Sequence, residues 1–305
     1  MTRNQTFIKG FALAALLPLL AACSNDDNGL PQDNEAQPVQ INIGTRASFD
    51  GETSDWQNDD KVGLSIKGYN EQSATQYTLT YSNGSWSASP DIGEKMLPAT
   101  VEAWWPNTNN ASATNFNFTY SDNTYILYDD QVWIEGTVEQ SSEQLLAACD
   151  WMTYNAELTS ATLDINMVHR LCKVTVKINT QEGYTPTITN PRFFTIAGSD
   201  NNDNFREVIP LTTNNNGINY TAIIIPYYYQ GVGHGSYPPF IKLTVDDTDQ
   251  LVTLAPDFAM DFKYYGAGKA YTFNLTVNNP NATTRSESTP DCKLELVEVR
   301  DMNEE

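Results

Sequence analysis

The clearest strand pattern in the chain is residues 163–178, LDINMVHRLCKVTVKI. Every second residue is apolar from Leu163 to Met167 and again from Val174 to Ile178. Side chains of a strand point to opposite faces in turn, so this period of two predicts strands with one buried face. A set of β-strands is therefore expected to begin near residue 160.

Similar alternation occurs on both sides of this stretch. Strands are expected towards the N-terminus at residues 39–43, 62–66, 77–81, 101–105 and 116–120, and towards the C-terminus at residues 193–197, 220–225, 241–245, 251–254, 271–277 and 294–299. Turn signals such as Ser82-Asn83-Gly84 separate them, which is typical of a β-sandwich. The best helix candidate is residues 141–152, where hydroxyl groups precede Glu143. The pattern predicts an all-β protein with two tandem domains, residues 47–160 and 161–305.

The composition limits the partners of the chain. Its 305 residues include 38 acidic and 17 basic side chains, which give a formal charge of −21. Nucleic-acid binding needs Lys and Arg to replace counterions, and attachment to anionic lipid needs a basic patch, so the charge argues against both. The spacing of Cys149, Cys172 and Cys292 indicates neither a zinc site nor a disulfide framework. Unpaired thiols are favoured, and a single disulfide bridge between Cys149 and Cys172 is the alternative.

The N-terminus has the layout of a secretory signal. Arg3 and Lys9 precede an apolar run of about ten residues, whereas a membrane-spanning helix needs roughly 20. We expect residues 1–22 to be removed as a signal peptide. The segment Leu20-Ala21-Ala22-Cys23 resembles a bacterial lipobox, which implies acylation of the Cys23 thiol and attachment of a tether, residues 24–38, to the outer membrane. An ordinary secretory signal with an incidental cysteine is the alternative.

The sequence offers little support for an enzyme. His169 lies within an alternating pattern and is expected to be a hydrogen-bonded structural residue at a domain interface, and His234 lies in a glycine-rich hairpin tip. The chain has no G-x-S-x-G motif and no pair of neighbouring histidines for a metal. Residues 199–204 are rich in oxygen ligands but lack the glycine and glutamate of an EF-hand loop. We therefore expect no catalytic residue, no metal and no cofactor.

Several tryptophans leave a second function open. The side chains of Trp86, Trp104, Trp105 and Trp133 could stack on sugars. Most of these aromatics lie inside strand patterns, so core packing is their expected role. A surface glycan-binding lipoprotein is the alternative function, and it would stay monomeric and retain glycan.

Several separated segments resemble the fimbrillin family of Bacteroides-type bacteria, including its Mfa-like branch. The matching segments are, in chain order, Trp56–Leu64, Glu102–Pro106, Cys149–Met152, Asn166–Val174, Tyr271–Val277 and Leu294–Met302. They span nearly the whole chain. Met167 stands where the family usually has phenylalanine, and Met302 stands in for a tryptophan that members often carry near the last strand.

The resemblance implies two transthyretin-like β-sandwiches, exported as a lipidated precursor and assembled into a fimbria by exchange of β-strands. Residues 23–46 would form the lipidated leader. The protein would be a structural subunit, of stalk or anchor type, that serves adhesion. Its partners would be other fimbrial subunits, a processing protease, ligands on host or bacterial surfaces, and the outer membrane through its lipid.

In this scheme the leader contains a removable strand with Val39, Ile41 and Ile43 on one face. Cleavage between Arg46 and Ala47 would remove that strand and leave unpaired backbone groups above an apolar groove. For Arg46, a solvent-facing charge at a strand end is the alternative, and anchor members of the family keep their leader.

The terminal strand is the expected donor in this exchange. Leu294 and Leu296 share one of its faces and Val297 and Val299 the other, and a bulge would account for the break in alternation. A polar link, residues 278–292, precedes it. A free strand after such a link is suited to pairing with another subunit.

Overall fold

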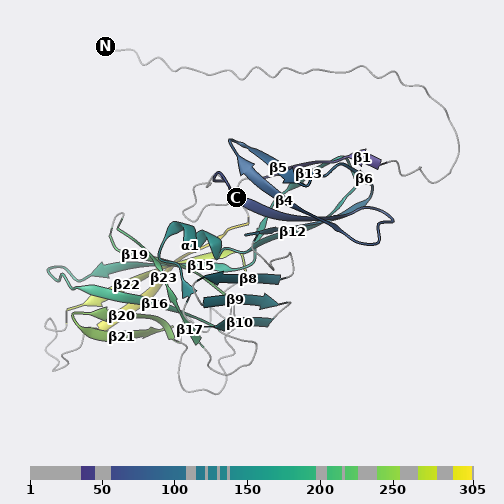
Figure 1. Ribbon diagram of the computed structural model, residues 1–305. Helices are drawn as coiled ribbons and strands as arrows, with labels where there is room; N and C mark the ends of the chain where they lie inside the picture. The colour runs from purple at the N-terminus through teal and green to yellow at the C-terminus, as the bar shows by residue number, and fades with distance from the viewer. Residues whose placement is uncertain are drawn as a thin grey trace, which may run out of the picture. The chain divides into compact units, whose positions relative to one another are not determined.

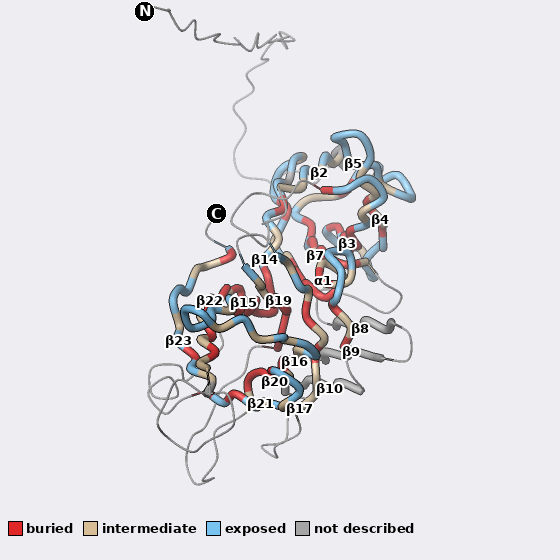
Figure 2. The backbone as a smooth tube through the Cα atoms, turned by 90° about the vertical axis from the view of Figure 1, so that its left-hand side faces the viewer, coloured by how far each residue is buried: buried red, intermediate tan, exposed pale blue. Residues whose placement is uncertain are grey.

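The computed structural model describes residues 36–44, 56–107, 115–120, 123–128, 131–135, 138–196, 205–214, 217–225, 239–254, 267–279 and 291–303. Within these ranges nearly all regular structure is β-strand, and the only helix is α1, Glu143–Ala148. The strands form several sheets around two clusters of buried side chains (Figure 1, Figure 2). The predicted all-β class is confirmed.

The first core is the buried cluster that includes Val62, Leu64, Ile66, Val101 and Ile165. A six-stranded antiparallel sheet contributes most of it, in the spatial order β14 (Val168–His169), β12 (Met152–Leu158), β7 (Ala99–Trp105), β3 (Lys61–Lys67), β4 (Thr75–Ser82) and β5 (Ser85–Ser89). Two short pairs border the same core, β1 (Ala36–Pro38) with β6 (Glu94–Met96) and β2 (Gln40–Ile43) with β13 (Thr162–Ile165). The predicted strands at residues 62–66, 77–81 and 101–105 are confirmed.

A glycine inside β3 is required by a tryptophan on the neighbouring strand. Gly63 lies directly opposite Trp104 of β7. A Cβ atom on Gly63 would lie 2.0 Å from Cε2 of Trp104, far inside van der Waals contact. The indole ring therefore fills the space that any other residue at position 63 would need.

The hairpin between β4 and β5 has the turn that the sequence predicts. Asn83 and Gly84 both have positive φ, 50° and 84°. Positive φ at both central residues defines a type I′ turn, whose twist matches that of the flanking strands. The Asn-Gly pair thus sets the register of this hairpin, in which Tyr81 lies opposite Trp86.

The second core is the buried cluster that includes Val174, Val176, Phe193, Phe240 and Phe273. One of its sheets consists, in spatial order, of β18 (Leu211–Thr213), β19 (Asn219–Ile224), β15 (Cys172–Thr180), β22 (Lys269–Asn278) and β23 (Asp291–Asp301). The other consists of β11 (Val138–Glu139), β17 (Phe205–Ile209), β16 (Ile188–Ile196), β20 (Pro239–Val245) and β21 (Thr248–Thr253). A separate three-stranded sheet contains β8 (Asn115–Tyr120), β9 (Asn123–Tyr128) and β10 (Gln131–Glu135).

Three phenylalanines join the two sheets of the second core. The ring centroid of Phe240 lies 5.6 Å from that of Phe193 and 4.8 Å from that of Phe273. These tilted and edge-on contacts are the arrangements that aromatic quadrupoles favour. Figure 2 shows that buried stretches of the chain coincide with β15 and β19 in the second core and with β7 in the first core.

The helix is shorter than the sequence predicts. Ser142 caps α1, and its hydroxyl accepts a hydrogen bond from the N–H of Leu145 at 3.2 Å. The predicted end at Met152 is wrong, because the chain leaves the helix at Cys149 and Met152 begins β12. Seven residues of β12 pair with β7, and this pairing outweighs the helical preference of the preceding apolar run.

The chain alternates between the two cores around the predicted domain boundary. Val138, Leu146 and Trp151 pack in the second core, whereas Met152 and Ile165 pack in the first. A cut at residue 160 would therefore divide a segment of the first core, and the partition into two domains stays a prediction.

Candidate functional site

The leader segment, residues 36–44, closes one side of the first core. Its first part, β1, pairs antiparallel with β6, and its second part, β2, pairs parallel with β13. Val39, Ile41 and Ile43 are half-buried and pack against the first core. The predicted removable strand is thus a strand of the fold, with the three apolar residues on its inner face.

Three hydrogen bonds hold the end of the leader segment. The N–H of Gly44 donates to the carbonyl of Ile165 at 2.9 Å, and the indole Nε1–H of Trp56 donates to the carbonyl of Gly44 at 2.8 Å. On the outer face, the side-chain amide of Asn42 donates to Oδ1 of Asp164 at 2.9 Å. These contacts fix the register of β2 on β13.

Trp56 links the leader segment to the first core. Its ring centroid lies 5.0 Å from that of Trp86 and 5.4 Å from that of Trp105, both edge-on. The hydrogen bond from Trp56 to the leader was not foreseen from the sequence, although the tryptophan itself belongs to a recognised motif. Because Trp56 contacts both the leader and the core, its fluorescence should report whether the leader is in place.

The residues of lipidation and processing lie outside the described residues. These are Cys23, Arg46 and Ala47. Their expected roles stay predictions. The described leader segment nevertheless ends two residues before Arg46, so cleavage there would cut its covalent link to the rest of the chain and leave it held by non-covalent contacts alone.

The terminal strand β23 is paired within its own chain. It lies antiparallel to β22 over ten register pairs, and Leu294 is 8% exposed in the second core, against which Leu296 packs. The register shifts between Thr272 and Phe273, where Val297 is the extra residue of β23. The role of β23 as a donor strand stays a prediction.

This bulge corrects the expected faces of the strand. Val299 was expected to share a face with Val297, but it lies opposite Tyr271, a buried residue of the inner face of β22. A bulge inserts one residue and so restores the alternation after it. Val299 therefore returns to the face of Leu294 and Leu296, and 45% of it is exposed.

The residues around the end of β23 also form ion-pair and hydrogen-bond contacts within the chain. Asp301 forms an ion pair with Lys269, which, with the N–H of Asn303, holds the pKa of Asp301 below its ordinary value. The N–H of Met302 donates to the carbonyl of Gly268 at 2.7 Å, and the side-chain oxygen of Asn303 accepts from the N–H of His169 at 2.8 Å. The last described residues thus bind back to β14 and to the start of β22.

His169 forms a buried pair with an acidic residue. Its Nδ1 lies 2.8 Å from Oδ1 of Asp150, and the side chains are 3% and 0% exposed. The predicted hydrogen bond is confirmed. Within the described ranges no three His, Cys, Asp or Glu side chains gather as metal ligands would. The pair joins the segment between α1 and β12 to β14, an arrangement that stabilises the fold.

Cys149 and Cys172 are both buried and free, and burial raises the pKa of each thiol. A thiol reacts as its thiolate, so both should be inert in the folded protein. In a protein lacking residues 1–23, a colorimetric thiol reagent is expected to titrate at most Cys292, which is half-buried, and to reach three thiols per chain only after denaturation. Rapid reaction of all three in the folded state would contradict this expectation.

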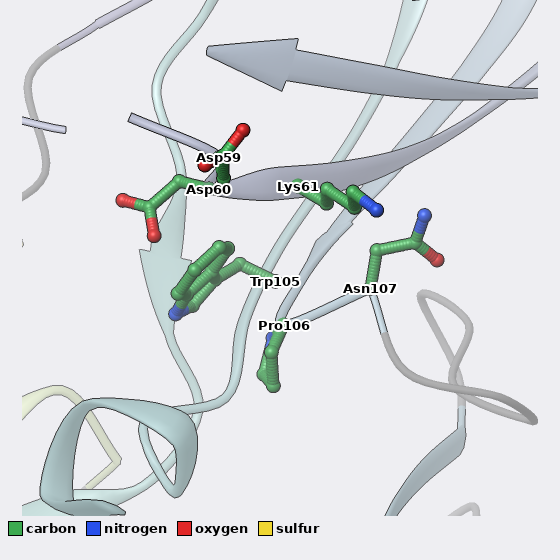
Figure 3. Close-up of a pocket in the computed structure, with 6 residues that line it drawn as sticks. All are labelled: Asp59, Asp60, Lys61, Trp105, Pro106 and Asn107. Atoms are coloured by element: carbon green, nitrogen blue, oxygen red, sulfur yellow. The ribbon is translucent and has the colours of Figure 1, made fainter. Parts of the chain in front are cut away.

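A shallow hollow of about 310 Å³ lies at the end of β3 and β7. Figure 3 shows Asp59 and Asp60 on one side of it and Lys61 and Asn107 on the other. The polar groups serve local structure, since Asp60 accepts from the N–H of Gln57 at 2.8 Å and the amide of Asn107 donates to the hydroxyl of Thr78 at 3.1 Å. The hollow therefore offers few groups for a ligand.

The tryptophans in and around the six-stranded sheet are packing residues, with Trp56, Trp86 and Trp105 at the first core and Trp104 over Gly63. Trp56, Trp104 and Trp105 are buried, and half-buried Trp86 packs on Trp56 and Tyr81. The side chain of Trp133 lies outside the described residues. The buried rings have no free face on which a sugar could stack.

The model of the fimbrillin-like family matches residues 45–291. The chain belongs to the fimbrillin-like family. This fimbrillin is similar to a candidate cell adhesion protein from Bacteroides ovatus, with a TM-score of 0.57 and 14% identity over 88% of this chain and 98% of that one. It is also similar to one from Bacteroides uniformis, with a TM-score of 0.51 and 15% identity over 90% and 100% of the two chains. No curated protein matches the chain.

Membership of this family supports a role as a fimbrial subunit in adhesion at the cell surface, and it indicates a structural rather than a catalytic protein. The two solved structures share the fold of this fimbrillin. In the described part of the chain, the helix is too short to cross a membrane.

Proposed function

We propose that this fimbrillin is a structural subunit of a cell-surface fimbria, joined to a neighbour by donor-strand exchange. The observation that carries the proposal is the leader segment, a strand that completes the first core and ends just before Arg46. The lipid on Cys23 would hold the precursor at the outer membrane. A protease would then cleave after Arg46, and a strand from another subunit would take the place of the leader.

The geometry of the leader explains why its loss would create a binding site. Removing β2 leaves the parallel edge of β13 without a partner, and removing β1 does the same to β6. Both edges border the surface of the first core that Val39, Ile41 and Ile43 now cover, which we call the leader groove. An unpaired edge beside an apolar surface is a template for an added strand.

The leader is held on the first core by three of its own half-buried aliphatic side chains. Each contributes about 1 kcal/mol of binding free energy if half of its full burial energy is counted. Four register pairs with β13 and three with β6 add to this. An incoming strand with a similar pattern would recover a similar energy. The exchange therefore needs no external energy source beyond cleavage of the peptide bond that ties the leader to the domain.

Replacement of Arg46 by alanine tests the proposal in cells. Fimbriae sheared from cells that make the wild-type chain are expected to contain it with Ala47 at its N-terminus. The Arg46→Ala chain is expected to stay with the cells and to keep its leader, because the bond is no longer a substrate. Mass spectrometry of the sheared and cell-bound fractions measures both outcomes.

The variant Arg46→Lys is the matched control for charge. If Arg46 is only a solvent-facing charge, lysine preserves its role and the variant should behave as the wild type. If an arginine-specific protease acts there, lysine should block processing as alanine does. Trimming of Arg46→Ala at the same bond as the wild type would contradict the proposal.

A further inference from the structure

We infer that this subunit receives a strand of a different protein in its leader groove and keeps its own strand β23 in its own sheet. The inference rests on the proposed function and adds the kind of partner to it. Residues 1–305 would then accept a strand from a neighbour but donate none, since β23 would not pass to a second copy.

The extent of pairing is the first reason. β23 forms ten register pairs with β22, whereas the leader forms four with β13 and three with β6. A β23 strand that moved into the leader groove of another copy would exchange the longer pairing for a shorter one. Because backbone pairs contribute similar amounts each, the exchange is unfavourable.

The side chains of β23 give the second reason. Leu294 lies opposite Leu275, and Leu296 lies opposite Phe273, both of them core residues of β22. Departure of β23 would expose these residues of the second core. No such cost applies to the leader, whose removal is followed by entry of a new strand at the same place.

The C-terminal end of β23 is the third reason. Asp301 pairs with Lys269, and the N–H of Met302 donates to the carbonyl of Gly268. The side chain of Met302 is itself buried. A strand anchored at its end must break these contacts as well as its ladder before it can leave.

The leader defines what the partner strand should contain. Three apolar side chains at alternate positions would replace Val39, Ile41 and Ile43. Between the last two, a residue with an N–H donor or a positive charge would replace Asn42 and face the exposed carboxylate of Asp164. A backbone carbonyl after them would accept the indole N–H of Trp56.

In the direction of the leader, β23 fits this pattern poorly. With Leu294 and Leu296 in the places of Ile41 and Ile43, Glu295 would face Asp164. Entry in the opposite direction with Leu296, Leu294 and Cys292 in the places of Val39, Ile41 and Ile43 would bring Lys293 to Asp164 instead. The pattern of side chains alone therefore does not exclude β23 as the incoming strand. The inference rests instead on the extensive pairing and packing of β23 in its own sheet.

A disulfide between β22 and β23 tests the inference directly. Asn274 and Glu295 lie opposite each other in the antiparallel ladder, at a separation that a disulfide can span. We would combine Asn274→Cys and Glu295→Cys with Cys292→Ala, so that the neighbouring thiol cannot compete. The matched control is the Cys292→Ala chain, and both are trimmed after Arg46 by an arginine-specific protease.

The probe is a labelled synthetic peptide of residues 36–45, the leader itself. We expect both trimmed chains to be monomeric by light scattering and to bind the peptide with affinities that agree within twofold, whether the disulfide is oxidised or reduced. Peptides with Asn42→Lys and Asn42→Glu should bind about two- to fivefold apart, the lysine peptide more tightly, as expected of an exposed pair with Asp164.

Two other results are distinguishable from this one. Ladders of oligomers in the control and the reduced chain that disappear on oxidation would overturn the inference while leaving strand exchange intact, because β23 would then be the donor. Failure of the leader peptide to bind any trimmed chain would overturn the leader groove, and with it both the inference and the proposed function.

Discussion

Replacing His169 by alanine is expected to lower the free energy of unfolding by about 3 kcal/mol. Asp150 is fully buried, and within the described residues its Oδ2 has no hydrogen-bond partner, so its contact with His169 is what compensates its burial. Removing one partner of a buried pair costs about 3–5 kcal/mol when the pair is charged and about 1–3 kcal/mol for a neutral group left unsatisfied. Urea unfolding followed by tryptophan fluorescence measures the loss.

Val168→Ala is the matched control for this variant. Val168 is the neighbouring residue of β14, and its side chain is exposed. A surface substitution of this kind is expected to change stability by at most about 0.5 kcal/mol. A His169→Ala protein as stable as the control would contradict the structural role of the pair and would reopen the question of why a histidine stands there.

The strands with a strict period of two were predictable because their alternation has a direct physical cause. Val174 and Val176 of β15 are fully buried, and the next residue, Lys177, is exposed. The side chains on one face of a strand share one environment, so composition and burial repeat together. The same argument held for β22 and for residues 99–103 of β7, whereas β3 is buried at every position from Val62 to Ile66.

The pairing of strands could not be predicted from local sequence. β2 pairs with β13 although Asn42 and Asp164 are 122 residues apart, and β15 pairs in parallel with β22. Alternation shows which face of a strand is buried but not which edge it meets. The leader was therefore expected as a removable strand, whereas its partners β13 and β6 became visible only in the fold.

The errors in individual elements have a common origin in tertiary contacts. Met152 was placed in a helix because an apolar run precedes it, yet pairing with Trp105 makes it a strand residue. Val299 was placed on the wrong face because the bulge at Val297 is fixed by the register with β22. The hydrogen bond from Trp56 to Gly44 likewise depends on how the chain folds back on itself. The break in alternation after Leu296 signals the bulge itself but not its register, and the other two contacts leave no signal in the nearby sequence.

The substitution Ile41→Asp in the precursor is expected to lower the free energy of unfolding of the first core by about 2 kcal/mol. The variant loses the partial burial of an aliphatic side chain, about 1 kcal/mol, and places a carboxylate against an apolar surface, which adds a cost of similar size. Urea unfolding measures the change. The fluorescence of Trp56, which is hydrogen-bonded to the leader, and of Trp86, which packs on Trp56, reports it locally.

Gln40→Asp is the matched control, because it introduces the same charge on the exposed face of β2. Equal effects of the two substitutions would mean that the inner face of the leader does not contact the core as described. The expected difference also explains how one chain can hold a removable strand and a permanent one. The leader contributes a few kcal/mol through three half-buried side chains and seven register pairs in two short ladders, so a similar strand can replace it. β23, with ten pairs in one ladder and two leucines in the second core, contributes too much to be exchanged on the same terms.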